Sequence, residues 1–129
     1  GNIFTIFYHG VRLYDYRSNT FSVITGSATH GLLDGEFSQL KFRYPRGLVF
    51  LSYSTLVEAD SHNHMLRVLD LTTNTSSSIC SGVRGHSDGD EISCLMDYPW
   101  SPLKVKGVVY VGIRKFIRTI QGKNRFNTM

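Results

Sequence analysis

The sequence predicts an all-β protein, and two observations lead to this fold class. Apolar and β-branched residues alternate with polar ones at the period of a strand along the chain, and no useful stretch carries a helical stripe. The chain also repeats the same motifs about 54 positions apart. Its 129 residues, 41% of them hydrophobic, are enough for the packed core of one domain.

The repeat consists of four short motifs that occur twice in the same order. The first copy comprises residues 11–15, 18–20, 31–35 and 42–46 (VRLYD, SNT, GLLDG and FRYPR), and the second comprises residues 66–70, 73–75, 85–89 and 96–100 (LRVLD, TNT, GHSDG and MDYPW). Because both the order and the spacing are kept, we interpret the chain as a repeat protein.

Each repeat is expected to form one small antiparallel sheet. The predicted strands are residues 3–8, 11–14 and 20–24, then 47–51, 55–59, 66–69 and 77–80, then 103–105, 108–111 and 116–120. The connections between them are short and polar, as in hairpins. Four short antiparallel strands make one β-propeller blade, so we expect three units over residues 1–43, 44–97 and 98–129, with the outer two incomplete.

The middle unit resembles the NHL-repeat β-propellers. Residues 44–49 (YPRGLV) are similar to the Pro-x-Gly-apolar opening of that repeat, residues 56–60 (LVEAD) to its second strand, and residues 63–68 (NHMLRV) to the segment that names it. The resemblance covers most of the chain and is most specific in residues 44–71. It implies that the following residues are structural: Pro45, Gly47, Asp60, Asn63, His64, Arg67, Asp88, Gly89 and Pro99.

Each of these residue types suits a backbone task. Prolines fix φ where the chain enters the first strand of a unit, and Gly47 allows backbones to approach closely. Asp60, Asn63 and His64 can hydrogen-bond the backbone of the turn that they form. The Asp-Gly pairs at 34–35 and 88–89 are expected to make tight turns with positive φ at glycine.

The two cysteines, Cys80 and Cys94, flank the second Gly-x-x-Asp-Gly turn. In an oxidising compartment they could form a disulfide that closes a short loop. We favour two unpaired buried thiols, because the first repeat has Thr25 in place of Cys80 and so does not require a bridge. Neither cysteine belongs to a CxxC motif, which argues against a zinc or redox site.

Positive charge accumulates at the end of the chain. From residue 104 onward there is no acidic residue, and the basic ones are Lys104, Lys106, Arg114, Lys115, Arg118, Lys123 and Arg125. We predict that the first five of these form a surface for an anionic partner such as nucleic acid or an acidic protein. The alternative is a solvated last sheet whose charges discourage pairing at its edge.

The sequence shows no set of residues that predicts catalysis or metal binding. Asp60, His62 and His64 could ligate a metal, but the repeat resemblance accounts for Asp60 and His64 without one. His30 and His86 lie near Asp34 and Asp88 in the two turns, yet no nucleophile accompanies them. We therefore predict no enzyme activity, no cofactor and no metal. Residues 74–76 form an N-glycosylation sequon, usable only in a secretory compartment.

The predicted function is a non-enzymatic scaffold that binds proteins through its loops. Two alternatives are single-stranded RNA binding through the basic C-terminal face and carbohydrate binding through exposed aromatic residues such as Trp100. No run of about 20 apolar residues predicts membrane insertion. Because fewer than four blades cannot close a ring, we expect either a longer array or a homodimer that completes six blades.

Overall fold

The computed structural model describes residues 2–121 and 125–128. Its fold is all-β, as predicted, and η1 (Ser61–Asn63) is the single helical turn within the described part. The strands are β1 (Asn2–Phe7), β2 (His9–Asp15), β3 (Thr20–Ser27), β4 (Gly35–Glu36), β5 (Leu48–Ser52), β6 (Thr55–Asp60), β7 (Met65–Asp70), β8 (Thr75–Ile79), β9 (Trp100–Val105), β10 (Val108–Ile113), β11 (Phe116–Gln121) and β12 (Arg125–Thr128).

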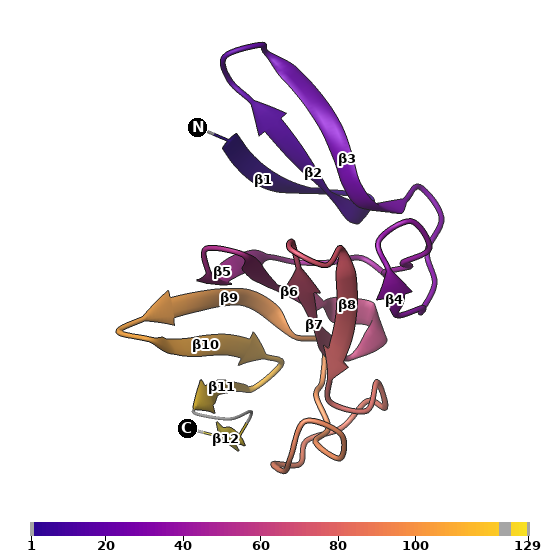
Figure 1. The fold of residues 1–129 in the computed structure, drawn as a ribbon. Coiled ribbons are helices and arrows are strands. Elements are labelled where there is room, and N and C mark those ends of the chain that lie inside the picture. Colours follow the sequence, from indigo (N-terminus) through magenta and orange to yellow (C-terminus); the bar gives the residue numbers. More distant parts are fainter. Residues whose placement is uncertain (1, 122–124, 129) are drawn as a thin grey trace.

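The strands form three antiparallel sheets. The N-terminal sheet has the order β1-β2-β3, the central sheet β4-β8-β7-β6-β5, and the C-terminal sheet β12-β11-β10-β9. Figure 1 shows the central sheet lying between the other two. Consecutive strands pair within each sheet except at β4, which precedes β5 in the chain but pairs with β8 at the far edge.

The expected count of three, four and three strands is wrong at two edges. The central sheet has a fifth strand because β4 pairs Gly35 with Ser76 and Glu36 with Thr75. The C-terminal sheet has a fourth because β12 pairs with β11. Neither strand has a periodic pattern in the sequence, because β4 has only two residues and β12 has no apolar alternation. Both strands form because the folded sheet offers an edge with which they can pair.

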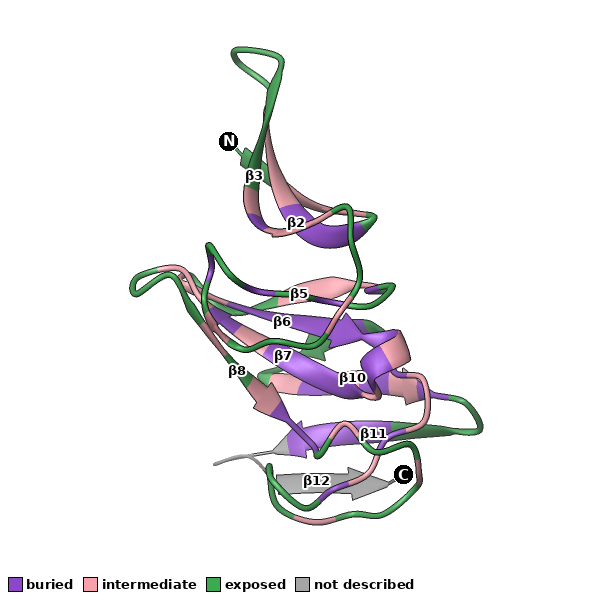
Figure 2. Cartoon of the chain, turned by 90° about the vertical axis from the view of Figure 1, so that its right-hand side faces the viewer, coloured by how far each residue is buried: buried purple, intermediate pink, exposed green. Residues whose placement is uncertain are grey.

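Because successive side chains of a strand point to opposite faces of the sheet, the apolar side chains of the central sheet are divided between its two faces. Leu56 and Leu69 are fully buried toward the N-terminal sheet, whereas Val57 and Ala59 are fully buried toward the C-terminal sheet. Figure 2 shows the buried residues gathered in the central sheet and in the strands that face it. The central sheet is thus covered on both sides.

Two cores follow from this arrangement. One lies between the central and C-terminal sheets and contains Val57, Ala59, Leu66, Ile79, Cys80, Cys94, Met96, Val109, Val111, Ile113 and Ile120. The other contains Val11, Phe37, Leu40, Phe42, Leu56 and Leu69. Three of these residues, Phe37, Leu40 and Phe42, come from the connection between β3 and β5, which therefore fills the space between the N-terminal and central sheets.

Cys80 and Cys94 form a disulfide, so the preference for two unpaired thiols is wrong. Both side chains are buried, and the bond joins the end of β8 to the loop that follows it. At the equivalent place in the first repeat, the Thr25 hydroxyl donates to the Phe37 carbonyl at 2.8 Å. The two repeats therefore use different chemistry at the same position, which a comparison of residue types could not decide.

Glycine serves two purposes at the predicted positions. Gly35 has a φ of +117°, as expected for the first Asp-Gly turn, but Gly89 does not have positive φ, so that expectation is wrong for the second. A Cβ at Gly89 would lie 2.9 Å from the Ser93 hydroxyl, which makes it a site of close approach instead. Gly47 has a φ of +128°, and a Cβ there would lie 2.8 Å from Pro102 of β9.

Candidate functional site

The two loops that connect consecutive sheets are built alike. We define the first loop as residues 31–42 and the second loop as residues 85–96. In the first, the Gly31 amide donates to the Phe42 carbonyl at 2.9 Å; in the second, the Gly85 amide donates to the Met96 carbonyl at 3.0 Å. Each loop also contains one antiparallel bridge, Leu33 with Lys41 and Ser87 with Leu95. The repeat seen in the sequence is therefore a repeat of backbone structure.

Arg67 of β7 holds the first loop to the central sheet. Its Nε and Nη2 donate to Asp34 Oδ1 at 2.9 and 2.6 Å. Nη2 also donates to the Leu33 carbonyl at 2.6 Å, and Nη1 donates to the Lys41 carbonyl at 2.9 Å. The arginine side chain is fully buried, so these contacts take the place of water.

The far side of the same guanidinium binds Asp60 Oδ2 at 2.9 Å. Asp60 Oδ2 also accepts from Asn63 Nδ2 at 2.9 Å, and Asn63 donates to the Gly31 carbonyl at 2.7 Å. Asp60 Oδ1 accepts the Arg43 amide at 2.7 Å. These buried contacts place Asp60, Asn63 and Arg67 in one network that joins η1, β7 and the first loop.

Arg118 of β11 repeats this arrangement on the second loop. Its Nη2 lies 3.2 Å from Asp88 Oδ1, and its Nη1 donates to the Leu95 carbonyl at 2.5 Å. Lys41 and Leu95 accept at matching positions of their loops, as do Asp34 and Asp88. Arg118 is fully buried, so its assignment to a surface for an anionic partner is wrong. We call this contact of a strand arginine with a loop aspartate the arginine clamp.

The remaining members of the predicted basic surface do not lie together. Lys104 and Lys106 precede β10, and Lys104 donates to the Leu51 carbonyl of the central sheet. Arg114 and Lys115 follow β10, at the opposite end of a six-residue strand. Six residues of extended chain separate the two pairs by roughly 20 Å. Lys123 lies outside the described residues.

His9 and His64 make the same contact in successive repeats. Nδ1 of His9 accepts the Tyr44 amide at 3.0 Å, and Nδ1 of His64 accepts the Tyr98 amide at 3.2 Å. Tyr44 and Tyr98 each precede one of the predicted structural prolines, Pro45 and Pro99, which are buried. Each histidine thus ties its own sheet to the chain that enters the next one.

These contacts also bring six rings into one row. Their centroids follow one another at 5.7, 4.5, 4.8, 5.1 and 4.4 Å in the order His30, His9, Tyr44, His62, Tyr98 and His64. We call this the ring row. It was not predicted, because its members come from six separate positions of the sequence that only the stacking of the three sheets brings together.

Three histidines of the ring row have lowered pKa values, and an arginine lies beside the row. Burial is the main cause that lowers the pKa values of His9, His62 and His64. Neighbouring basic groups lower these pKa values further, while Asp60 acts in the opposite direction on His9 and His62, and Asp97 on His64. The Arg84 guanidinium lies over the Tyr98 ring at 5.3 Å and pairs with Asp97 at 2.7 Å.

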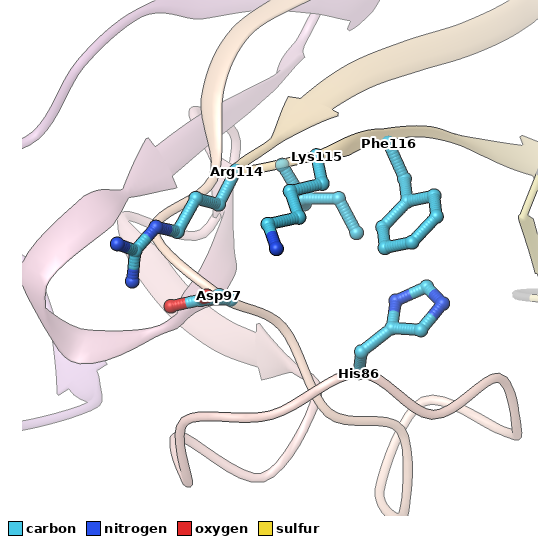
Figure 3. A pocket seen from close by; sticks show the side chains of 6 residues that line it. His86, Asp97, Arg114, Lys115 and Phe116 are labelled. Carbon is cyan, nitrogen blue, oxygen red and sulfur yellow. The ribbon is translucent and has the colours of Figure 1, made fainter.

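A hollow of about 320 Å³ opens next to this arginine pair. It is lined by His86, Asp97, Ile113, Arg114, Lys115 and Phe116. The rings of His86 and Phe116 are stacked, with centroids 4.2 Å apart. Figure 3 shows the Lys115 ammonium directed into the space between Asp97 and these two rings.

The polar groups of the hollow are mostly donors. Nη2 of Arg118 lies 3.4 Å from Nδ1 of His86. Arg114 and Lys115 pair with no carboxylate within the described residues. Asp97 supplies the acceptor: its Oδ1 accepts from Arg84 Nε, and its Oδ2 has no side-chain partner among the described residues. A hydroxylated ligand would therefore find both donors and an acceptor here.

Outside the hollow, Glu58 is the buried acidic group with unpaired oxygens among the described residues. Glu58 is fully buried, neither carboxyl oxygen has a hydrogen-bond partner, and burial followed by the nearby Asp60 raises its pKa well above the ordinary value. It lies in the packed interior between the N-terminal and central sheets. No three His, Cys, Asp or Glu side chains of the described residues are grouped to hold a metal ion. Within residues 2–121 and 125–128, no helix has the length and hydropathy to cross a membrane.

Comparison with known proteins identifies relatives of the fold. No protein-family model and no curated protein sequence matches the chain. Among solved structures, it is similar to an auxiliary nutrient binding protein from Bacteroides thetaiotaomicron (TM-score 0.73, 17% identity, covering 88% of this chain and 32% of that one). It is also similar to an auxiliary nutrient binding protein from Bacteroides ovatus (TM-score 0.75, 16% identity, covering 95% and 33%). At these identities the similarity shows a shared fold, and this chain spans about a third of each of those proteins.

Proposed function

We propose that this chain is a non-enzymatic binding scaffold built from NHL-type propeller blades. The support is the regular construction of successive sheets, with a repeated arginine clamp and a repeated histidine contact at each junction. The groups that could do chemistry have structural partners: Asp60 and Arg67 bind each other, and His64 accepts a backbone amide. The groups without such structural partners lie on the surface, where they can contact a binding partner.

The observation that carries this proposal is that both outer sheets expose an apolar face. On the N-terminal sheet, Ile3, Phe21 and Val23 are 53%, 55% and 61% exposed. On the C-terminal sheet, the exposed apolar residues of the outer face are Trp100, Leu103, Val105 and Ile117. Contiguous apolar patches of this kind mark protein interaction sites. We propose that protein partners cover them, and that a second copy can do so by completing a six-bladed ring.

Light scattering on the 129-residue chain tests the scaffold proposal. A dimer is expected, and changing Val23→Asp together with Ile117→Asp should convert it to a monomer by placing charge on both apolar faces. Tyr53→Asp is the matched control, because Tyr53 is 95% exposed in the β5–β6 turn and belongs to neither face. A stable, cooperatively melting monomer of 14.6 kDa would contradict the dimer.

A second candidate function is the binding of a carbohydrate in the hollow. The hollow combines stacked rings with hydrogen-bond donors and one acceptor, and the exposed Trp100 borders a second depression that shares Ile113, Arg114, Lys115 and Phe116. Two proteins of similar fold are named nutrient binding proteins. RNA binding has less support, because the basic residues on which it depended are divided between two ends of the sheet and the interior.

Calorimetry with neutral and uronic-acid oligosaccharides tests the second candidate. The Lys115→Gln, Arg114→Gln double variant should bind at least about tenfold more weakly, as expected for the loss of charge-assisted hydrogen bonds. The Lys104→Gln, Lys106→Gln double variant changes the net charge equally at the other end of β10 and should bind normally. Equal losses in both variants would contradict a site in the hollow.

A further inference from the structure

The N-terminal sheet carries a third arginine at the clamp position. Arg12 matches Arg67 in the repeated VRLYD and LRVLD motifs. The structure supports this match independently, because His9 and His64, each three residues earlier, both accept the amide of a tyrosine that enters the next sheet. Arg12 pairs with Thr5 and Val23 across the N-terminal sheet, as Arg67 pairs with Glu58 and Ser78 across the central one.

Arg12 differs from the other two arginines in having no loop to hold. Its Nε donates to Thr5 Oγ1 at 3.3 Å, and its guanidinium lies 4.2 Å from the centre of the Phe21 ring. Within the described residues it forms no ion pair, whereas Arg67 and Arg118 each bind a loop aspartate. The aromatic contact holds the guanidinium on the outer face, and neither Nη atom of Arg12 donates a hydrogen bond within the described part of the chain.

The surroundings of Arg12 are those of an uncovered interface. Ile3, Phe21 and Val23, all more than half exposed, lie on the same face of the sheet as Arg12. In the central sheet, the corresponding face is buried under the first loop and the N-terminal sheet. At the other two junctions, an aspartate turn binds the equivalent arginine. At the outer face of the N-terminal sheet, Arg12 lies beside exposed apolar residues and no such turn is present within the described residues.

We propose that this outer face is a docking surface for a further blade-like unit that presents an Asp-Gly turn, and that the aspartate of that turn binds Arg12. The inference rests on the proposed scaffold function and names the chemistry of its partner. The charge pairing follows the two junctions already formed, where a buried guanidinium binds one loop carboxylate and at least one loop carbonyl.

A second copy of the chain fits this surface less well than a unit with a free acidic turn. The aspartates of both its loops are already bound, Asp34 by Arg67 and Asp88 by Arg118. The outer face of its C-terminal sheet offers apolar residues such as Leu103 and Ile117 but no carboxylate in the described strands. It could cover the apolar residues and so form the proposed dimer, but the Arg12 guanidinium would then lack a counter-charge, which makes that dimer weaker than a complex with an acidic turn.

The second loop provides a probe for this surface. A synthetic peptide of residues 80–96, closed by its own Cys80–Cys94 disulfide, carries the Asp88 turn without Arg118. Titrated into the isotope-labelled full chain, it should shift the NMR resonances of Thr5, Arg12 and Phe21. A peptide with Asp88→Asn should bind at least about tenfold more weakly, since the charge-assisted pair is lost.

Two variants of the chain localise the effect. Arg12→Gln should weaken peptide binding as much as the altered peptide does, and Arg12→Lys should recover part of it by restoring the charge without the fork. Arg17→Gln is the control, because Arg17 is exposed in the β2–β3 turn. Circular dichroism and the unfolding midpoint of each variant establish that it is folded.

Three results would overturn the proposal: no shift at Arg12, equal binding of the two peptides, or equal binding to Arg12→Gln and Arg17→Gln. These outcomes are separate from those of the scaffold proposal. In one outcome, light scattering shows a dimer that Arg12→Gln leaves intact, and the peptide does not bind. This outcome would support the apolar dimer and contradict the proposal that Arg12 binds an acidic partner. If the chain is a monomer and the peptide binds only through Arg12, the docking surface stands and the dimer is excluded.

Discussion

The first and second loops follow the same backbone path but are fastened in different ways. Both close with a glycine amide bonded to a carbonyl eleven residues on, and both are held by an arginine clamp. The first loop also buries Phe37 and Leu40, which are 8% and 3% exposed. The second has Ile92 near the corresponding place, 76% exposed, and is tied by the Cys80–Cys94 disulfide instead.

This difference separates what the repeat requires from what it tolerates. The arginine and the loop aspartate occur at both junctions, so the clamp is common to the architecture. The additional contact that holds each loop differs: buried apolar side chains in the first loop, and a disulfide in the second. The first loop fills the gap between two sheets with aromatic side chains, whereas the second loop exposes Ile92, buries Cys94 and Met96 near its end, and is constrained by a covalent bond.

The largest expected effect is on the clamp itself. Replacing Arg67 with Met leaves the fully buried Asp60 without its counter-charge, which should lower the free energy of unfolding by about 3–5 kcal/mol. Arg118→Met should cost less, about 1–3 kcal/mol, because Asp88 is 45% exposed and can be hydrated. Urea unfolding followed by Trp100 fluorescence measures both. Equal losses would show that the two clamps are energetically alike.

The apolar fastening is tested by truncating the aromatic residue of the first loop. Phe37→Ala removes a side chain from the core between the N-terminal and central sheets and should destabilise the protein by about 3–4 kcal/mol. Ile92→Ala is the matched change in the second loop and should cost less than about 0.5 kcal/mol, since Ile92 is exposed. A large loss from Ile92→Ala would mean that Ile92 anchors the second loop in addition to the buried Met96.

The covalent fastening is tested by Cys80→Ser with Cys94→Ser. Opening a loop of this length should cost about 3 kcal/mol through the greater freedom of the unfolded chain. Hydrogen exchange should then accelerate at the Gly85 and Leu95 amides of the second loop and remain unchanged at Gly31 and Lys41 of the first. Equal acceleration in both loops would contradict independent fastening.

The smallest expected effect concerns the histidine contacts at the two junctions. His64→Ala should lower the free energy of unfolding by about 1–2 kcal/mol, because the Tyr98 amide loses its acceptor. His30→Ala is the control, since His30 is exposed at the end of the ring row. If both variants melt alike, the contact contributes nothing to stability.

The same histidine contact has a pH dependence of defined sign. The folded pKa of His64 lies below its ordinary value of 6.5, so the unfolded chain takes up the proton first. The stabilisation is complete above pH 6.5 and is lost as pH falls through the lowered folded pKa. Melting curves between pH 4 and 8 should therefore show a smaller acid loss in His64→Ala than in the unaltered chain.

Much of the architecture could be predicted from local patterns. The strand pattern of apolar and β-branched residues places β5, β6, β7 and β10 within a few residues of their observed bounds, because such residues suit a pleated strand. The close approach and positive φ at Gly47 also followed from residue type. Asp60 and Asn63 instead bond the Arg43 amide and the Gly31 carbonyl, so the expectation that they bond the backbone of their own turn is wrong. Edge strands β4 and β12 carry no such pattern and were missed.

The sequence by itself determined the all-β class, the repeat and the positions of the turns, because these depend on the backbone preferences and polarity of neighbouring residues. Only the tertiary structure decided that Arg118 is buried, that Cys80 reaches Cys94, and that six rings form one row. Each of these depends on distances between residues far apart in the chain. Such distances are set by the packing of the sheets. The sequence allows Arg118 to face water, and it is this packing that buries Arg118 against Asp88 of the second loop.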